Sequence, residues 1–480
     1  VGSEMCIRDR NTEVIDDSNE VNLTFSVIPG NKTYTRKILF TGNYVTQDEV
    51  LRREMRQFEG AWSSNNSIEA GKVRLERLGF FKEVNVETVP VIGTEDEIDI
   101  IYSVEEETTG SVGGNLGYSD FGLMLGFNLQ EQNFLGSGNT VGIGINKNIY
   151  SENYNISFVD PYATKDGVSL GYNVYFRETD YGEFNVANYL TNSNGIGAQF
   201  GYPTSDITRL GYSLTYDKTD IDIGTLPARE IYDFVSAEGN IFETISAQAT
   251  WQRVTLNRGL FPTAGSSTVL SLSTTIPGSD LNYYRASVRQ RYYRPLSTNF
   301  VFGFQGELGY LDVYGDTKET PFFQNFYAGG PRSLRGFESN TLGPRSTDAP
   351  CYEFNYEEGS CPNLIDIDGD GELDSPYLNP YANNTSRYRD RPIGGNIKIE
   401  GSLQLIFRLP FIEDQRSLRS AFFLDFGNVF SDNCKDYQIN CYKPAVEDLR
   451  YSYGVGITWI TGFGPLSLAI AKPTNAGPQE

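Results

Sequence analysis

The 480-residue sequence contains no histidine, the side chain that most often serves as general base or metal ligand near neutral pH. This absence excludes a His-ligated zinc enzyme and a Ser-His-Asp hydrolase, and the chain has no P-loop or nucleophile arrangement. Carboxylate catalysis stays open, but we expect no catalytic residue and no required cofactor. The formal net charge of −23 argues against nucleic-acid binding, because that needs a basic surface.

Long hydrophobic stretches are missing as well. Mean hydropathy is −0.38, and no apolar run reaches the about 18 residues that a transmembrane helix needs. A transmembrane β-barrel stays compatible, because its strands alternate and their hydropathy averages out. The 13% aromatics and 49 glycines suit barrel strands and tight turns, although a soluble all-β protein would have the same composition.

Cysteine is scarce, with five in the chain. Four of them form two local pairs in polar loops, Cys351 with Cys361 and Cys434 with Cys441, which indicate disulfides in an oxidising compartment. Metal binding is the weaker alternative, because neither pair has C-x-x-C spacing. The fifth lies in residues 1–10, which resemble a translated sequencing-adapter read-through, so we exclude them from fold reasoning and expect any signal peptide to be lost.

Residues 20–27 and 97–104 share one pattern. Such a repeat suggests tandem small domains, with residues 11–30 ending one domain and 31–108 forming a complete one. Between the two copies the sequence predicts the order β-α-α-β-β. The first helix would begin with a capping box at Thr46 and would place Leu51, Met55 and Phe58 on one face. The second helix would run from about Ser67 to Leu78.

From residue 109 to 480 the pattern changes to strands separated by Gly/Asn/Asp turns. In the clearest one, residues 449–459, one face is apolar or aromatic and the other is small or polar. A membrane barrel shows this alternation, and so does a sandwich with its apolar face inward. About fifteen such segments favour one large barrel, and because bacterial barrels have even strand numbers, we expect one strand to be missing after residue 480.

Several motifs then follow one another in a fixed linear order. They are TLNRGLFPT at 255–263, TIPGS at 275–279, NFYAGG at 325–330, LRGFESNTLGP at 334–344, GGN at 394–396, FFLDFGNV at 422–429 and GFGPL at 462–466. Over about residues 20–480 the chain resembles the BamA family of outer-membrane protein assembly factors. The domain at 31–108, with RLGFF at 77–81, resembles a POTRA domain.

The resemblance implies an α+β POTRA domain in the periplasm, followed by an all-β transmembrane antiparallel barrel in the bacterial outer membrane, 16-stranded in the family. It also implies a non-enzymatic insertase that folds client barrels through a seam between the first and last strands. The implied partners are outer-membrane lipid, unfolded outer-membrane proteins and accessory assembly lipoproteins. Alternatives are a TamA-like translocation barrel, a two-partner secretion transporter and, more remotely, a diffusion porin.

In the family, an arginine motif on a long extracellular loop, here about residues 314–394, folds into the barrel lumen. The motif residues are Leu334, Arg335, Gly336 and Phe337. Strand alternation places Asp425, Gln404 and Glu400 on the inner face. Gln404 aligns with a family glutamate and brings no charge, and Glu400 lies about 13 Å further along the strand. We therefore predict Arg335–Asp425 as the main pair, with Gln404 as a weaker acceptor and Glu400 reachable only if the loop shifts.

The first predicted barrel strand, about residues 110–118, is rich in glycine. The four are Gly110, Gly113, Gly114 and Gly117. Such a strand pairs weakly and tolerates register slips, which agrees with an opening seam. A Gly-rich domain junction would show the same composition.

The long loop also contains an acidic run. Its ligand-type residues are Asp366, Asp368, Asp370, Glu372 and Asp374. Their spacing, with a glycine at the sixth position, fits an EF-hand-type Ca²⁺ loop, but the twelfth position is Tyr377 where that motif has glutamate. We expect weak Ca²⁺ binding here, and a solvated acidic loop tip is the alternative.

Overall fold

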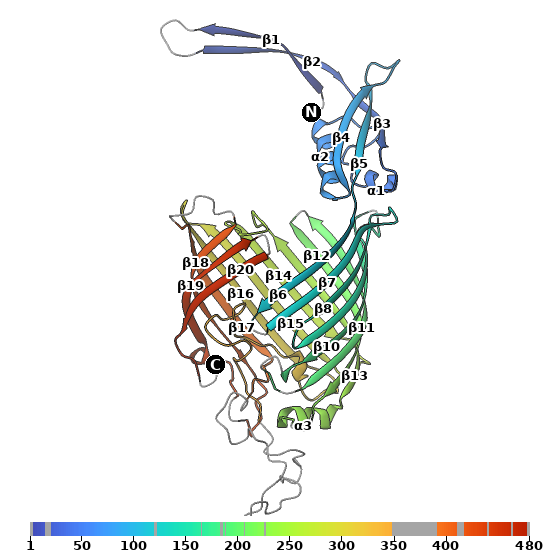
Figure 1. The fold of residues 1–480 in the computed structure, drawn as a ribbon. Coiled ribbons are helices and arrows are strands. Elements are labelled where there is room, and N and C mark those ends of the chain that lie inside the picture. Colours follow the sequence, from blue (N-terminus) through green and yellow to red (C-terminus); the bar gives the residue numbers. More distant parts are fainter. Residues whose placement is uncertain are drawn as a thin grey trace, which may run out of the picture. The chain divides into compact units, whose positions relative to one another are not determined.

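The protein has a small α+β domain and a large antiparallel sheet (Figure 1). The computed structural model describes residues 3–14, 21–119, 122–164, 166–182, 186–187, 189–205, 207–224, 227–347, 391–409, 417–438, 441–461 and 464–477. The chain separates into two compact units, one containing the α+β domain and the other most of the large sheet. Ahead of the domain, β1 (Ser3–Val14) and β2 (Val21–Lys32) pair only with each other.

The α+β domain has the predicted order β-α-α-β-β. Its elements are β3 (Tyr34–Thr41), α1 (Asp48–Arg52), α2 (Asn65–Arg77), β4 (Phe81–Pro90) and β5 (Glu97–Glu106). In its sheet, β5 is central, parallel to β3 and antiparallel to β4. Gly79 ends α2 with a φ of 69°, a backbone conformation that glycine adopts without the steric cost of a side chain.

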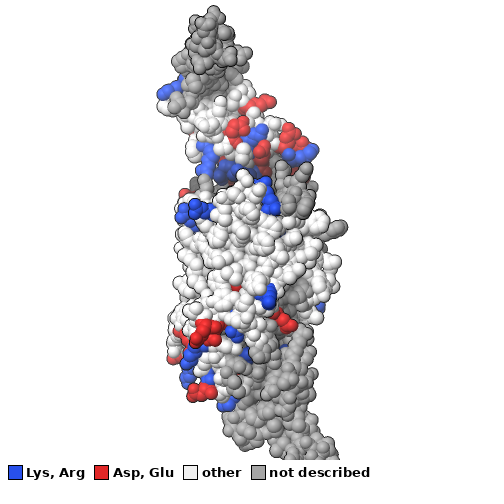
Figure 2. All heavy atoms as spheres, turned by 90° about the vertical axis from the view of Figure 1, so that its left-hand side faces the viewer, with Lys and Arg blue, Asp and Glu red and all other residues white. Residues whose placement is uncertain are grey.

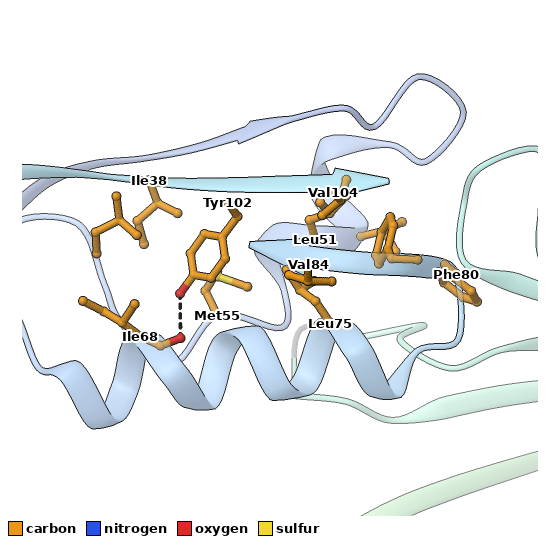
Figure 3. Close-up of a cluster of buried hydrophobic side chains, with 12 residues drawn as sticks. Ile38, Leu51, Met55, Ile68, Leu75, Phe80, Val84, Tyr102 and Val104 are labelled. Carbon is orange, nitrogen blue, oxygen red and sulfur yellow. Dashed lines mark hydrogen bonds between the residues drawn. The ribbon is translucent and has the colours of Figure 1, made fainter. Parts of the chain in front are cut away.

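One hydrophobic core holds this domain together (Figure 3). Leu51, Leu75, Ile100 and Tyr102 are fully buried in it. The Tyr102 hydroxyl donates to the Ile68 carbonyl at 2.9 Å, which satisfies its polar end, and burial raises the pKa of Tyr102 to about 12. This core makes the domain a self-contained folding unit.

The first helix of the domain differs from the prediction. It spans only residues 48–52, the Phe58 side chain is 71% exposed, and Thr46 makes no capping bond. The reason lies in Glu106, whose carboxylate accepts backbone N–H bonds from Tyr44, Val45 and Thr46 at 3.0, 2.9 and 2.6 Å. These contacts fix the chain before the helix in a turn, so the helix begins later than the capping pattern indicated.

The second unit is dominated by fifteen antiparallel strands in sequence order. They are β6 (Gly110–Ser119), β7 (Gly122–Phe134), β8 (Asn139–Lys147), β9 (Ser151–Asp160), β10 (Ser169–Asp180), β11 (Leu190–Ser205), β12 (Thr208–Asp222), β13 (Ile241–Val254), β14 (Gly265–Thr275), β15 (Tyr283–Pro295), β16 (Phe300–Val313), β17 (Ile397–Phe407), β18 (Leu418–Phe430), β19 (Arg450–Thr461) and β20 (Gly464–Pro473). The sheet curls into a barrel (Figure 1), and β6 and β20 are its two end strands. The predicted fold class is confirmed.

The outer face of the barrel is apolar. Along β19, Tyr453, Ile457 and Trp459 are exposed, while Ser452 on the other face is fully buried. Figure 2 shows this apolar outer surface on the barrel wall, where a broad band carries few charged side chains. The apolar side of the alternation therefore points outward, as in a membrane barrel and unlike a sandwich.

The loops at one end of the barrel form a second core. It contains α3 (Arg229–Glu238), the short 3₁₀ helix Phe322–Gln324 and aromatic residues of several loops. The Asp233 carboxylate of α3 accepts a 2.8 Å bond from the Tyr437 hydroxyl. Tyr437 lies in the loop closed by the disulfide Cys434–Cys441, which confirms that predicted pair. Within the described ranges, no helix is long and apolar enough to cross a membrane.

Candidate functional site

The motif arginine forms a buried ion pair on the inner face of the barrel. Arg335 Nε donates to Asp425 Oδ2 at 2.7 Å and Nη2 donates to Oδ1 at 2.6 Å. The Arg335 backbone N–H also donates to Oδ2, at 3.2 Å. Asp425 is 0% exposed and the arginine side chain 18%. This two-pronged contact is the arrangement in which a guanidinium binds a carboxylate most strongly.

Two further groups fix the guanidinium. Its Nη2 donates to Ser402 Oγ at 3.0 Å, and its central carbon lies 3.4 Å from the centre of the Phe423 ring. Gly456 on β19 lies beside it, where an added Cβ would stand at an ordinary contact distance of 3.8 Å from Arg335 Nη1. The arginine therefore touches three consecutive strands, β17, β18 and β19.

The other motif residues hold the loop in place. Leu334 and Phe337 are buried in a cluster with five neighbours: Leu311, Phe326, Ala328, Leu342 and Val429. Gly336 has a φ of 96°, and a Cβ there would lie 3.1 Å from the Ala471 Cβ on β20. Only glycine combines that backbone conformation with so close an approach to the last strand.

The other two predicted partners do not bind Arg335. Gln404 donates to Ser402 Oγ at 3.3 Å, while Glu400 accepts a 2.9 Å bond from Ser333 and pairs with Lys398 at 2.8 Å. The strand register gives the reason, because Ser402 stands directly opposite Asp425 and Gln404 stands opposite Phe423. The sequence prediction missed Ser402, although its inward position followed from the same alternation.

The GGN run closes the loop that carries the motif. Asn396 Nδ2 donates to the Leu311 carbonyl at 3.0 Å and to Asp432 at 2.6 Å. Gly395 lies so close to β18 that a Cβ would stand 2.2 Å from the Phe430 carbonyl oxygen. The loop returns to the sheet through this tight contact. The close approach explains why a glycine stands at position 395 of the GGN run.

The end strand β6 is held differently. Added Cβ atoms at Gly113 and Gly114 would meet only a backbone oxygen at 4.0 Å, so neither glycine is needed for close packing. Gly110 and Gly117 complete the predicted set on this strand. Leu116 and Tyr118 are largely exposed. An added Cβ would stand 3.0 Å from Glu131 Oε2 at Gly110 and 3.1 Å from Met124 Cε at Gly117, so those two positions are tightly packed and Gly113 and Gly114 are not. Glycine inside a strand weakens the strand.

Two predicted sites lie outside the described residues. They are the acidic run Asp366, Asp368, Asp370, Glu372 and Asp374, and the pair Cys351 and Cys361. Over the described ranges, no group of three or more His, Cys, Asp or Glu side chains is placed to hold a metal ion.

Two family models match the chain. Residues 133–480 match the Omp85 superfamily domain, and residues 33–107 match POTRA, described as a surface antigen variable number repeat. The second match falls on the α+β domain and the first covers all but the start of the barrel. Both agree with the predicted architecture.

Similar curated proteins are outer membrane protein assembly factors BamA. The chain is 30% identical to that of Neisseria meningitidis serogroup B over 491 residues, which cover 97% of this chain and 57% of the relative. It is 29% identical to that of Buchnera aphidicola over 253 residues, 49% of this chain and 41% of the relative. The chain thus spans about half the length of the curated relatives it matches.

A solved structure is similar over the whole chain. It is the crystal structure of BamA from Haemophilus ducreyi lacking POTRA domains 1–3, with 30% identity and a TM-score of 0.78, covering 100% of this chain and 87% of that one. The barrel is an outer-membrane barrel, and the POTRA domain is periplasmic. Since the superfamily model covers most of the chain and a homologous structure covers all of it, the chain belongs to the Omp85 superfamily.

Proposed function

We propose that the protein is a non-enzymatic insertase that folds β-barrel proteins into the outer membrane. The observation that carries this proposal is that one chain joins a POTRA domain to an antiparallel barrel sheet whose first strand is the glycine-rich β6. An end strand presents unpaired N–H and C=O groups, to which another chain can add a strand. The relatives named as assembly factors support a client barrel as that chain.

The two end strands have different roles in this proposal. The glycine-rich β6 separates easily and offers its backbone to a client strand. The arginine motif is a clamp that keeps β17 to β20 together while the opposite edge opens, because its contacts extend from Ser402 to Ala471. The motif is then architectural and needs no chemistry of its own.

The partners follow from the two units. The apolar outer band contacts outer-membrane lipid, and the POTRA domain receives unfolded clients and accessory assembly lipoproteins in the periplasm. The acidic run at 366–374 remains a proposed weak Ca²⁺ site, since its spacing fits such a loop. Calorimetric titration with millimolar Ca²⁺ tests it, and the absence of heat would eliminate that site.

Photo-crosslinking during client insertion tests the proposal directly. The purified protein is placed in liposomes with a photoreactive amino acid at Leu116 on β6 and, as a matched control, at Tyr212 on β12. Both side chains are outward and exposed, at 73% and 52%, so they differ mainly in their distance from an end strand. We expect an urea-unfolded client barrel to crosslink at Leu116 and to fold faster than in empty liposomes. Equal crosslinking at both positions, or no faster folding, would contradict the proposal.

A further inference from the structure

Three neighbouring hollows run from the turns between strands at one rim of the barrel to the arginine motif on its inner face. Their volumes are 760, 700 and 320 Å³. The first two share Phe261 and Arg419, and the last two share Gln305 and Gln404. They therefore form one continuous lining from the turn after β13 to the motif loop.

Arginines dominate this lining. Besides Arg335 it contains six, which we call the arginine tract: Arg258, Arg289, Arg291, Arg332, Arg408 and Arg419. The carboxylates among its lining residues are Glu307 and Glu400. This local excess of positive charge is opposite in sign to the formal net charge of the whole chain, which is −23.

Both glutamates are already engaged. Glu307 binds Arg289 at 3.1 Å and Lys398 at 3.4 Å, and Glu400 binds Lys398 and Ser333. In the part of the chain that the structure describes, Arg258, Arg291, Arg332 and Arg408 have no carboxylate within ion-pair distance. The tract therefore has more cationic groups than the surrounding protein neutralises.

Arg419 adds a buried polar atom without a partner. Its guanidinium stacks over the Tyr293 ring at 4.8 Å, and its Nη2 is buried and hydrogen-bonded to none of the described residues. Arg419 lines both of the larger hollows. A buried N–H donor without an acceptor is costly, so this position fits a ligand that supplies an oxygen.

We infer that the arginine tract binds the carboxylates of an acidic polypeptide segment inside the barrel. This inference rests on the proposed function, since a client chain would supply that segment. Guanidinium groups pair with oxyanions through two parallel bonds. A polypeptide fits better than a lipid phosphate, because Arg289, Arg291 and Arg332 lie beside Arg335 on the inner face, away from the lipid. The amides of Gln305 and Gln404 and the ring of Phe261 also line it, and these suit peptide groups and an apolar side chain.

Peptide binding to the full 480-residue protein in detergent tests this inference. The probe is a fluorescein-labelled decamer of alternating Glu and Ser, compared by fluorescence anisotropy with the same decamer carrying Gln for Glu. We expect the acidic decamer to bind at least about tenfold more tightly, with affinity falling as salt rises. Equal affinity for the two decamers would overturn the inference.

Charge-removing variants locate the site. We expect Arg291→Gln with Arg332→Gln to weaken binding of the acidic decamer about tenfold. Arg209→Gln, the same change on the inner face of β12, should leave affinity unchanged. The pair Arg291→Lys with Arg332→Lys keeps the charge and should retain most of the binding, which separates lost charge from lost folding. Equal weakening by Arg209→Gln would place the binding elsewhere and overturn the assignment.

An experiment with inorganic phosphate and the crosslinking assay at Leu116 distinguish failure of this inference from failure of the proposed function. If millimolar inorganic phosphate protects the tract arginines from a guanidine-modifying reagent while the acidic decamer does not, the ligand is phosphate and the inference is wrong. If the client crosslinks at Leu116 but the acidic decamer does not bind, only the inference fails. If the decamer binds the tract and the client does not crosslink at Leu116, the tract stands and the insertase proposal fails.

Discussion

The two ends of the barrel sheet are held in opposite ways. Asp425 and Asn428 on β18 and Ser452 on β19 are fully buried, and the motif loop approaches Ala471 of β20, although the other face of β20 exposes Leu468 and Ile470. In β6, the backbone at Gly113 and Gly114 has open space on the side where a side chain would project. From this comparison we propose that the motif loop stiffens one end of the sheet while β6 forms a looser end.

Rough magnitudes agree with this contrast. Breaking one partner of a buried ion pair costs about 3–5 kcal/mol, because the remaining charge stays buried without compensation. Each glycine in a strand costs about 0.5–1 kcal/mol relative to alanine.

The largest effect is expected from Asp425→Ala. It leaves the Arg335 guanidinium buried with Ser402 as its remaining bonded side chain, at a cost of about 3–5 kcal/mol. The yield of barrel that resists unfolding in cold SDS should collapse. Glu400→Gln is the control on the neighbouring strand. It should lower the stability of the barrel by only about 1–2 kcal/mol, because it weakens contacts to Ser333 and Lys398 but leaves no arginine without its carboxylate. Equal losses in the two variants would show that the clamp is not the main support of this wall.

Gly336→Ala should have the next largest effect. The new Cβ meets a φ of 96° and the Ala471 Cβ on β20 at 3.1 Å, which together cost about 1–3 kcal/mol. Gly278→Ala is a matched control, because its φ is 101° and no atom lies within 4 Å of the added Cβ. Urea titration of the folded barrel should show a lower midpoint for Gly336→Ala than for Gly278→Ala. Identical midpoints would mean that the contact with β20 adds nothing.

Stiffening β6 should have a smaller effect on stability and a larger one on function. Gly113→Val with Gly114→Val raises strand propensity by about 1 kcal/mol per site and meets no close contact. The barrel should become more stable while client insertion slows. Gly211→Val on β12, where an added Cβ reaches only ordinary contact distances, should leave insertion unchanged. Faster insertion by the β6 variant would reverse the proposed role of the loose end.

The smallest effect concerns the POTRA domain. Burial alone would raise the pKa of Glu106, but hydrogen bonds from Thr46, Val45 and Tyr44 outweigh it and hold that pKa below its usual range. A carboxyl with a depressed pKa contributes stability above its unfolded pKa of about 4.3, and this contribution disappears as pH falls through the lower folded value. The protection factors of the amides at residues 44–46, which correct for the intrinsic exchange rate, should therefore fall below about pH 4. Glu106→Gln should remove most of that pH dependence, and an unchanged profile would contradict the assignment.

Strand alternation predicted much of this molecule. It gave about fifteen barrel strands and the inward position of Asp425, because a period of two depends only on local geometry. It did not decide alone whether the apolar face points outward, since a sandwich shows the same alternation. It did not identify Ser402 as a partner of Arg335, because that pairing depends on the long-range register between neighbouring strands. The α1 error has a similar origin, since Glu106 lies far along the chain from the amides that it binds.

Native-state hydrogen exchange of the folded barrel tests the central claim most directly. If the sheet has one loose and one clamped end, backbone amides of β6 should exchange about a hundredfold faster than those of the other end strand, β20, and Asp425→Ala should narrow that gap. Equal protection of β6 and β20, or faster exchange in β20 of the unmodified protein, would contradict the account.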